Sequence, residues 1–450
     1  MNESLQRYLS DMTHLVKNQW PLASRVWPGL DYTDVNLLLI SVNHKDGQPR
    51  YWSLTIHGMR QVTAGELGQV SQPAVNNFAI EKVMGKKGVI ITLDSTRPAE
   101  SPENLFRLAT HELVHGWFQP DIASLSPSQS RNSRYPLDYR PRLYRFMVIK
   151  NLQQAARQPQ ETLHLCHARY WFNKWQTEYQ EEYQRIKVFD ILEGSAFYIE
   201  QMIVALKKET NLLQAGASLS SGFNITPAED LTLDSESYIL GDVAGVLLDK
   251  RLPQWKSTFY TNQVPPAELL LNTLTDCNIE QVTSAYEGLF QKKVKRENQR
   301  LFNDFMIVDE VLNNAGIPLL RLDAAMQQGG FTSKGFYTFK GQDVILAMSA
   351  KYSSSAGHLQ IMNTNVLDDD TSISVPLPAS TELKNNTLVL NTSKLKGEIR
   401  VRAERDGKNR IIYVPDNPEA QRQASVLPSP DEPYLSASFF NHDNPGALHD

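Results

Sequence analysis

The segment from Ser101 to Pro120 constrains the fold of this 450-residue chain more than any other. Ser101 is a good helix N-cap, Pro102 suits the first helical position and Gln119-Pro120 ends the helix, which predicts a helix of about four to five turns. The residues around its middle are uncharged: Leu108, Ala109, Thr110, Leu113, Val114, Gly116 and Trp117. A surface helix would usually carry Lys or Glu at such positions, so we expect this helix to be buried.

Two histidines and a glutamate lie on this helix, where His111, Glu112 and His115 form the pattern H-E-x-x-H. The i, i+4 spacing places both imidazoles on one face, about 6 Å apart at Cβ, and two neutral ring nitrogens at that separation can share one zinc ion. Glu112 projects beside the metal, where a general base must lie to deprotonate an attacking water. The alternative is a chance pattern, in which two histidines only pack on a core helix.

A catalytic zinc site needs a third protein ligand and an open fourth position. The chain has two cysteines, Cys166 and Cys277, too few for a thiolate-rich site, so that ligand must be a histidine or a carboxylate. Glu193 is the best candidate, because it lies in a predicted helix whose buried face comprises Ile191, Ala196, Ile199, Ile203 and Leu206. A carboxylate among apolar residues is unfavourable unless a cation compensates its charge.

The two segments together resemble a known family. HELVH at 111–115, followed 193 − 115 = 78 residues later by the glutamate of LEGSAFYIE, is similar to the gluzincin group of zinc metallopeptidases. In that group the third ligand is a glutamate on a second helix, often in a Glu-Gly-x-Ala setting. The resemblance covers about residues 85–255 and implies that His111, His115 and Glu193 are the zinc ligands and that Glu112 is the base.

The chain departs from relatives within that group. The gap of 78 residues is longer than in its aminopeptidases, and no Gly-x-Met-Glu-Asn segment is present, so the resemblance does not imply aminopeptidase activity. Thermolysin-like relatives place an aspartate four residues after the ligand glutamate to orient the first histidine, but position 197 is Phe197. Asp190 or Glu200, one or two helical turns from Glu193, could orient His111 instead.

Asp121 is an alternative third ligand, because it lies six residues after His115, where metzincin-like enzymes place theirs. Those enzymes need glycine at the intervening position for a sharp turn, whereas this chain has Phe118 and then Pro120. The pattern therefore favours Glu193 over Asp121.

A further helix is predicted over DSESYILGDVAGVLLDKRLPQWK, in which Gly241 and Gly245 would let another helix approach closely. Tyr238 lies on the same side. It resembles the tyrosine of the Tyr-x-x-Gly helix that follows the third ligand in some gluzincins, where the phenol donates to the oxyanion. The alternative is a packed tyrosine with its hydroxyl at the surface. Tyr198 is a second candidate for the same role.

Other polar clusters are interpreted as structural. Arg140, Arg142 and Arg145 could bind a substrate carboxylate, but solvated or ion-paired arginines are the favoured interpretation. The basic run at 292–300 is typical of the exposed face of a helix, predicted over 279–314. His164, Cys166 and His167 belong to an ordinary helix, since one turn cannot aim all three inward.

The order of patterns along the chain predicts an α+β fold with a metallopeptidase-like core and a C-terminal all-β domain. Residues 1–100 combine an N-terminal helix over 3–18 with a small mixed sheet, whose strands are expected at 35–42, 51–56 and 88–93. Residues 101–325 form a mainly helical zinc-binding lobe. Short alternating segments at 330–415 predict a β-sandwich-like domain, and the proline-rich residues 416–450 a flexible tail.

Composition excludes several classes of protein. The 45 Lys+Arg against 50 Asp+Glu leave a net charge of −5, without the basic excess that nucleic-acid binding needs. No apolar run approaches the about 20 residues of a membrane span, and the N-terminus lacks the apolar core of a signal peptide. We expect a soluble protein, cytoplasmic or exported without a recognisable signal peptide, and two cysteines leave that choice open.

Together these patterns predict a zinc-dependent, metallopeptidase-like hydrolase that cleaves a peptide or protein substrate, with Zn²⁺ as its cofactor. One alternative is a catalytically inactive gluzincin-like scaffold whose C-terminal β domain binds a protein or glycan partner. Another is a purely structural zinc site. The substrate, the choice between endo- and exo-cleavage and the oligomeric state stay open.

Overall fold

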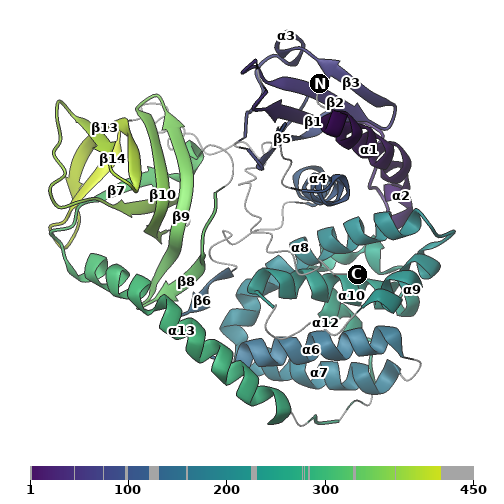
Figure 1. Cartoon of the computed structure of the whole chain (residues 1–450). Coiled ribbons are helices and arrows are strands. Elements are labelled where there is room, and N and C mark those ends of the chain that lie inside the picture. The colour runs from purple at the N-terminus through teal and green to yellow at the C-terminus, as the bar shows by residue number, and fades with distance from the viewer. Residues whose placement is uncertain are drawn as a thin grey trace. The chain divides into compact units, whose positions relative to one another are not determined.

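The computed structural model describes residues 3–44, 46–73, 75–96, 100–120, 131–158, 161–223, 231–275, 277, 279–281, 284–327, 331–369 and 371–416. It is a mixed α+β structure with a small sheet, many helices and a C-terminal sheet region, as predicted (Figure 1). The chain divides into two units, Met1–Ser124 with Tyr139–Phe290 and Leu125–Asp138 with Gln291–Asp450. Within the described ranges, every helix is too short or too polar to cross a membrane.

The first unit contains a five-stranded mixed sheet with the strand order β3-β2-β1-β5-β4. Its strands are β1 (Val35–Val42), β2 (Arg50–Thr55), β3 (Gly58–Val62), β4 (Phe78–Ile80) and β5 (Lys87–Asp94). Strand β1 is parallel to β5 and antiparallel to β2. It is buried along almost its whole length, because most residues of its sequence VNLLLISV are apolar. The three predicted strands are confirmed, and the structure adds β3 and β4.

Helices make up the rest of this unit. They are α1 (Glu3–Gln19), α2 (Ala23–Val26), α3 (Ala64–Leu67), α4 (Pro102–Trp117), α6 (Arg140–Arg157), α7 (Glu161–Glu178), α8 (Gln180–Leu206), α9 (Leu212–Gly222), α10 (Leu233–Arg251), α11 (Phe259–Asn262), α12 (Pro266–Leu271) and the first part of α13 (Ser284–Asn313). The predicted start of α4 is confirmed, since the Ser101 side chain accepts a hydrogen bond from the backbone N–H of Asn104 and Pro102 is the first helical residue.

Helices α8 and α10 cross at two glycines. A Cβ atom on Gly241 would lie 2.1 Å from the Cα of Gly194, and one on Gly245 would lie 2.3 Å from the ring of Tyr198. Only hydrogen fits at either position, so the predicted close approach at Gly241 and Gly245 is confirmed. This crossing brings the helix that carries Glu193 against the helix that carries Tyr238.

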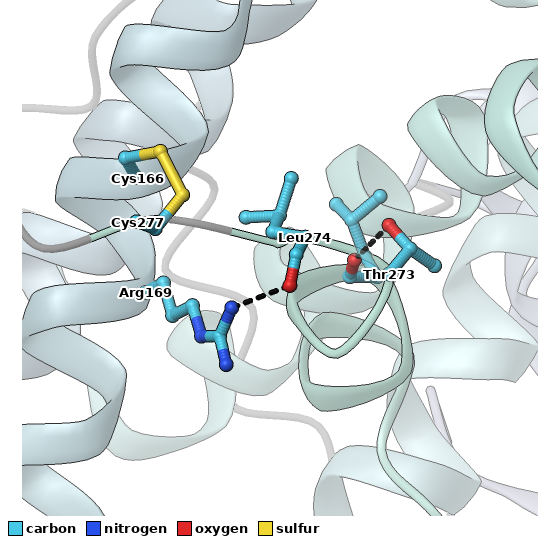
Figure 2. The surroundings of a disulfide bond; sticks show 6 residues. Cys166, Arg169, Thr273, Leu274 and Cys277 are labelled. Atoms are coloured by element: carbon cyan, nitrogen blue, oxygen red, sulfur yellow. Dashed lines mark hydrogen bonds between the residues drawn. A yellow bond between two sulfur atoms is a disulfide. The ribbon is translucent and has the colours of Figure 1, made fainter.

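A disulfide joins α7 to the chain that follows α12 (Figure 2). Cys166 pairs with Cys277, which is 111 residues further along the chain. Beside it, Arg169 Nη1 donates to the carbonyl oxygen of Leu274 at 2.6 Å. A bond that closes a loop of this length stabilises a fold by about 4–5 kcal/mol in the chain-entropy account. The closed loop contains both Glu193 and Tyr238, so the disulfide restrains the part of the chain that carries them.

The second unit is built on a nine-stranded sheet with the strand order β12-β13-β14-β7-β11-β10-β9-β8-β6. The strands are β6 (Ser133–Arg134), β7 (Leu319–Asp323), β8 (Gly335–Phe339), β9 (Gln342–Ser354), β10 (Gly357–Asp368), β11 (Ser372–Pro376), β12 (Thr387–Asn391), β13 (Leu395–Arg405) and β14 (Ile411–Pro415). Strand β13 also pairs with β10, which closes strands β10, β11, β7, β14 and β13 into a ring.

This unit includes more of the chain than the predicted 330–415. The later part of α13 belongs to it, because Leu301, Phe305 and Val308 pack in one apolar cluster with Val344 and Leu346 of β9. Strands β6 and β7 also pair within the sheet. Of the predicted tail, residues 417–450 lie outside the described part of the chain.

The helix crossing yields a first prediction. We expect Gly241→Ala to lower the free energy of unfolding by about 1–3 kcal/mol, because a methyl group at that point overlaps Gly194. Gly288 is the control: it is an exposed glycine of α13, and a Cβ there would meet nothing within 4 Å. Gly288→Ala should raise stability by about 0.5–1 kcal/mol. Chemical unfolding followed by circular dichroism measures both, and a Gly241→Ala protein as stable as the wild type would contradict the close crossing.

Candidate metal centre

Two residues from the N-terminal part of the chain contact Thr110, near the middle of helix α4. The Trp20 indole donates to Thr110 Oγ1 at 3.0 Å, and the Tyr32 hydroxyl donates to the Thr110 carbonyl oxygen at 2.9 Å. Thr110 is fully buried, and His111 and Glu112 beside it are 1 % and 4 % exposed. The expectation of a buried helix is therefore confirmed, and it places two ionisable side chains in the interior.

The structure brings the three predicted ligands together. His111 Nε2 lies 2.9 Å from His115 Nε2 and 3.0 Å from Glu193 Oε2, and His115 Nε2 lies 3.1 Å from the same oxygen. Two of these side chains come from α4 and the third from α8. His115 and Glu193 keep 15 % and 12 % of their side-chain surface exposed, so the cluster is reached from solvent on that side.

The outer nitrogens of both rings face hydrogen-bond acceptors. His111 Nδ1 lies 3.1 Å from Glu200 Oε2, and His115 Nδ1 lies 2.7 Å from Gln119 Oε1. A carboxylate oxygen and an amide oxygen can only accept, so each Nδ1 carries the proton. When either ring is neutral, its Nε2 atom then directs a lone pair toward Glu193. A cation at that point would be bound by all three side chains, so the residues present fit a metal ion.

Electrostatics around the cluster agree with this geometry. Burial opposes a positive charge on both rings, but the nearby carboxylates outweigh this effect. Glu193 and Glu200 raise the pKa of His111 to about 10, and Glu193 raises the pKa of His115 above its usual value. Burial also opposes the charge of Glu193, yet the two histidines hold its pKa well below its usual value. The point between the three side chains therefore favours positive charge.

The pKa of Glu112 shifts in the opposite direction from that of Glu193. Burial raises the pKa of Glu112 to about 7, although the nearby His115 and His111 oppose the rise. A carboxyl group with a pKa close to neutral can both accept and return a proton at neutral pH. The structure thus separates two glutamates by environment, one that stays ionised beside the histidines and one that can exchange a proton.

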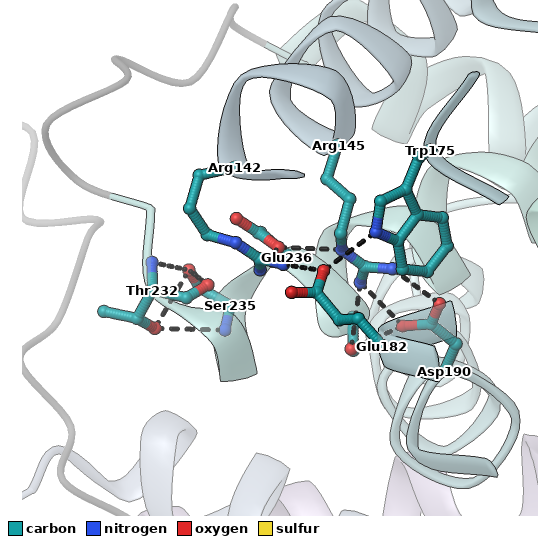
Figure 3. Close-up of polar contacts among 9 residues, drawn as sticks. Arg142, Arg145, Trp175, Glu182, Asp190, Thr232, Ser235 and Glu236 are labelled. Carbon is teal, nitrogen blue, oxygen red and sulfur yellow. Dashed lines mark hydrogen bonds and ion pairs between the residues drawn. The ribbon is translucent and has the colours of Figure 1, made fainter. Parts of the chain in front are cut away.

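The structure decides between the two predicted partners of His111. Glu200 is that partner, whereas Asp190 forms a bidentate pair with the guanidinium of Arg145 at 2.8 and 2.9 Å. Arg145 also donates to Glu236, and Arg142 bonds to Glu182 and Glu236 (Figure 3). The interpretation of Arg142 and Arg145 as ion-paired is confirmed, and this buried network joins α6, α8 and α10.

Tyr238 lies beside the cluster. Its ring meets that of His111 edge-on, with centroids 5.8 Å apart, and stacks on Phe197 at 5.4 Å. Its role as an oxyanion donor stays a prediction. Tyr198, the second candidate, is fully buried and donates its hydroxyl proton to Asp249, so its role is structural.

One residue of the site, Gln119, was missed by the sequence analysis, and the position of a proposed one, Asp121, is not described by the structure. Gln119 was noted only as the end of a helix, although its position one turn after His115 could have identified it as that ring's partner. Asp121, the alternative third ligand, lies outside the described residues.

Comparison of the chain with protein-family models, with curated proteins and with solved structures gives no significant match. What the site does has therefore to be argued from its own geometry.

Proposed function

We propose that the protein is a zinc-dependent hydrolase of the gluzincin type that cleaves peptide bonds. The observation that carries the proposal is the convergence of His111 Nε2, His115 Nε2 and Glu193 Oε2, which lie 2.9–3.1 Å from one another. Two imidazoles and one carboxylate are a known ligand set of catalytic zinc sites, which keep a fourth position open. The partial exposure of His115 and Glu193 supports such a position.

In the proposed reaction Zn²⁺, when bound, polarises the scissile carbonyl group and lowers the pKa of the attacking water. Glu112 accepts the proton of that water and delivers it to the leaving amine, a role that its place on α4 between the two histidines supports. Glu200 holds the imidazole of His111 in the orientation that ligation needs. Tyr238 donates a hydrogen bond to the developing oxyanion, which its place against His111 supports.

Metal content tests the ligand set. We expect about one zinc ion per chain in the purified wild type and a large loss in Glu193→Ala, because two histidines alone leave the site one ligand short. Glu181→Ala is the matched control, since Glu181 is an exposed glutamate of the same helix and should not affect zinc. Elemental mass spectrometry gives the stoichiometry. A wild type that takes up no zinc would contradict the proposal and favour the inactive scaffold.

Turnover tests the role of Glu112. We expect Glu112→Gln to keep its zinc and to lose about 10²–10⁴-fold in kcat, because an amide cannot accept the proton of the attacking water. Glu103→Gln serves as control, because Glu103 is an exposed residue of the same helix. Cleavage of a quenched fluorescent peptide library measures both variants. Full activity in Glu112→Gln would rule out Glu112 as the base.

We further infer that the protein works in an oxidising compartment, which favours export over the cytoplasm. The support is the disulfide between Cys166 and Cys277, which uses both cysteines of the chain. Disulfides persist in secreted and periplasmic proteins and are reduced in most cytosols.

A thiol count tests this inference. Protein isolated from its native source without reductant, then unfolded and alkylated, should show no added mass at Cys166 or Cys277, and alkylation at both should appear only after reduction. Quantitative alkylation before reduction would place the protein in a reducing compartment and contradict the inference.

A further inference from the structure

One carboxamide contacts one candidate ligand, His115, and two residues that flank a second, Glu193. Gln119 lies just beyond the end of α4, and its Oε1 atom is 2.7 Å from His115 Nδ1. Its Nε2 atom donates to the carbonyl oxygen of Leu192 at 2.7 Å and to Ser195 Oγ at 3.1 Å. Leu192 immediately precedes Glu193, and Ser195 follows it by two residues. The amide therefore links the second ligand to the backbone turn that presents the third.

The direction of this amide follows from its partners. A backbone carbonyl oxygen can only accept, so the NH₂ group of Gln119 must face Leu192 and its oxygen must face His115. Ser195 reinforces this arrangement, because its hydroxyl donates to the same Leu192 carbonyl and also bonds to the Tyr260 hydroxyl at 2.9 Å. His115 must then carry its proton on Nδ1, which leaves the Nε2 lone pair for a metal ion.

We propose that Gln119 is a positioning residue that couples His115 to Glu193, by holding the imidazole in its ligating tautomer and by fixing the turn of α8 from which Glu193 projects. The inference rests on the proposed function, since it needs a metal ion at this site. An amide offers an acceptor to His115 Nδ1 and a donor to the backbone of α8 without adding a charge to the site.

The affinity of the purified protein for Zn²⁺ tests the role. The metal is first removed with a chelator, and the dissociation constant is then measured by competition with a chromophoric chelator. We expect Gln119→Leu to raise the dissociation constant by about 10–100-fold, the usual effect of losing the hydrogen-bond partner of a ligating histidine. Gln119→Met, which keeps the unbranched shape of the side chain, should give a change in the same direction if the leucine variant does not fold.

Rescue by the conservative variant separates positioning from general stability. Gln119→Glu still offers an acceptor to His115 Nδ1 but cannot donate to Leu192 or Ser195. It should recover part of the zinc affinity that Gln119→Leu loses, because the tautomer of His115 is restored and the contacts to the turn of α8 are not, and its unfolding midpoint should stay below that of the wild type. Gln281→Leu is the matched control, because Gln281 accepts hydrogen bonds from Asn151 and Trp171 and touches no candidate ligand. That control should lose stability and keep wild-type zinc affinity.

The outcomes distinguish this inference from the proposed function. The inference is overturned if the wild type binds zinc and both Gln119→Leu and Gln119→Met have dissociation constants within threefold of the wild-type value, because Gln119 then does not position His115. It is overturned as well if Gln119→Glu binds zinc no more tightly than Gln119→Leu does. If the wild type binds no zinc, the proposed function itself fails and the inference fails with it.

Discussion

The candidate site depends on how α8 presents a single carboxylate to two imidazoles of another helix. Four residues close to Glu193 contact three other parts of the chain: Asp190 pairs with Arg145 of α6, Leu192 and Ser195 bond to Gln119 beyond α4, and Gly194 lies against Gly241 of α10. A helix held on three sides within two turns has little freedom to rotate or slide. The position of Glu193 is therefore set by packing and hydrogen bonds that do not involve the imidazoles.

Burial acts on the two central glutamates in the same direction, but their surroundings differ. Glu193 shares its space with two imidazole nitrogens, and their attraction outweighs the desolvation of its charge and lowers its pKa. Glu112 lies on the helix of those histidines but is not a member of the ligand cluster, and desolvation raises its pKa to about 7. Pairs of carboxyl groups whose environments shift their pKa values apart are a common way to divide ligand and acid–base roles.

Local patterns in the sequence predicted the local parts of this site. The start of α4, the spacing of His111 and His115, the apolar helix around Glu193 and the small residues of α10 are all readable within one or two turns. Features that join distant segments were missed, because their registers depend on tertiary packing. The pairing of Cys166 with Cys277 spans 111 residues, and the contact of β10 with β13 passes over the two strands β11 and β12 that lie between them in the sequence. Gln119 was missed for another reason, since its position at a helix end masked its role beside His115.

The glycine that follows Glu193 has a role that a ligand count would overlook. A side chain at position 194 would meet the Cα of Gly241 at 3.0 Å and the carbonyl oxygen of Ser237 at 3.1 Å, so it would push α10 away from α8. Tyr238 lies one turn before Gly241 on α10 and would move with it, away from His111. The Gly194–Gly241 contact therefore sets how closely Tyr238 approaches His111 on the helix that carries Glu193. In this chain the glutamate and the glycine act as one unit, because the residue that could bind the metal and the residue that lets the neighbouring helix approach are consecutive.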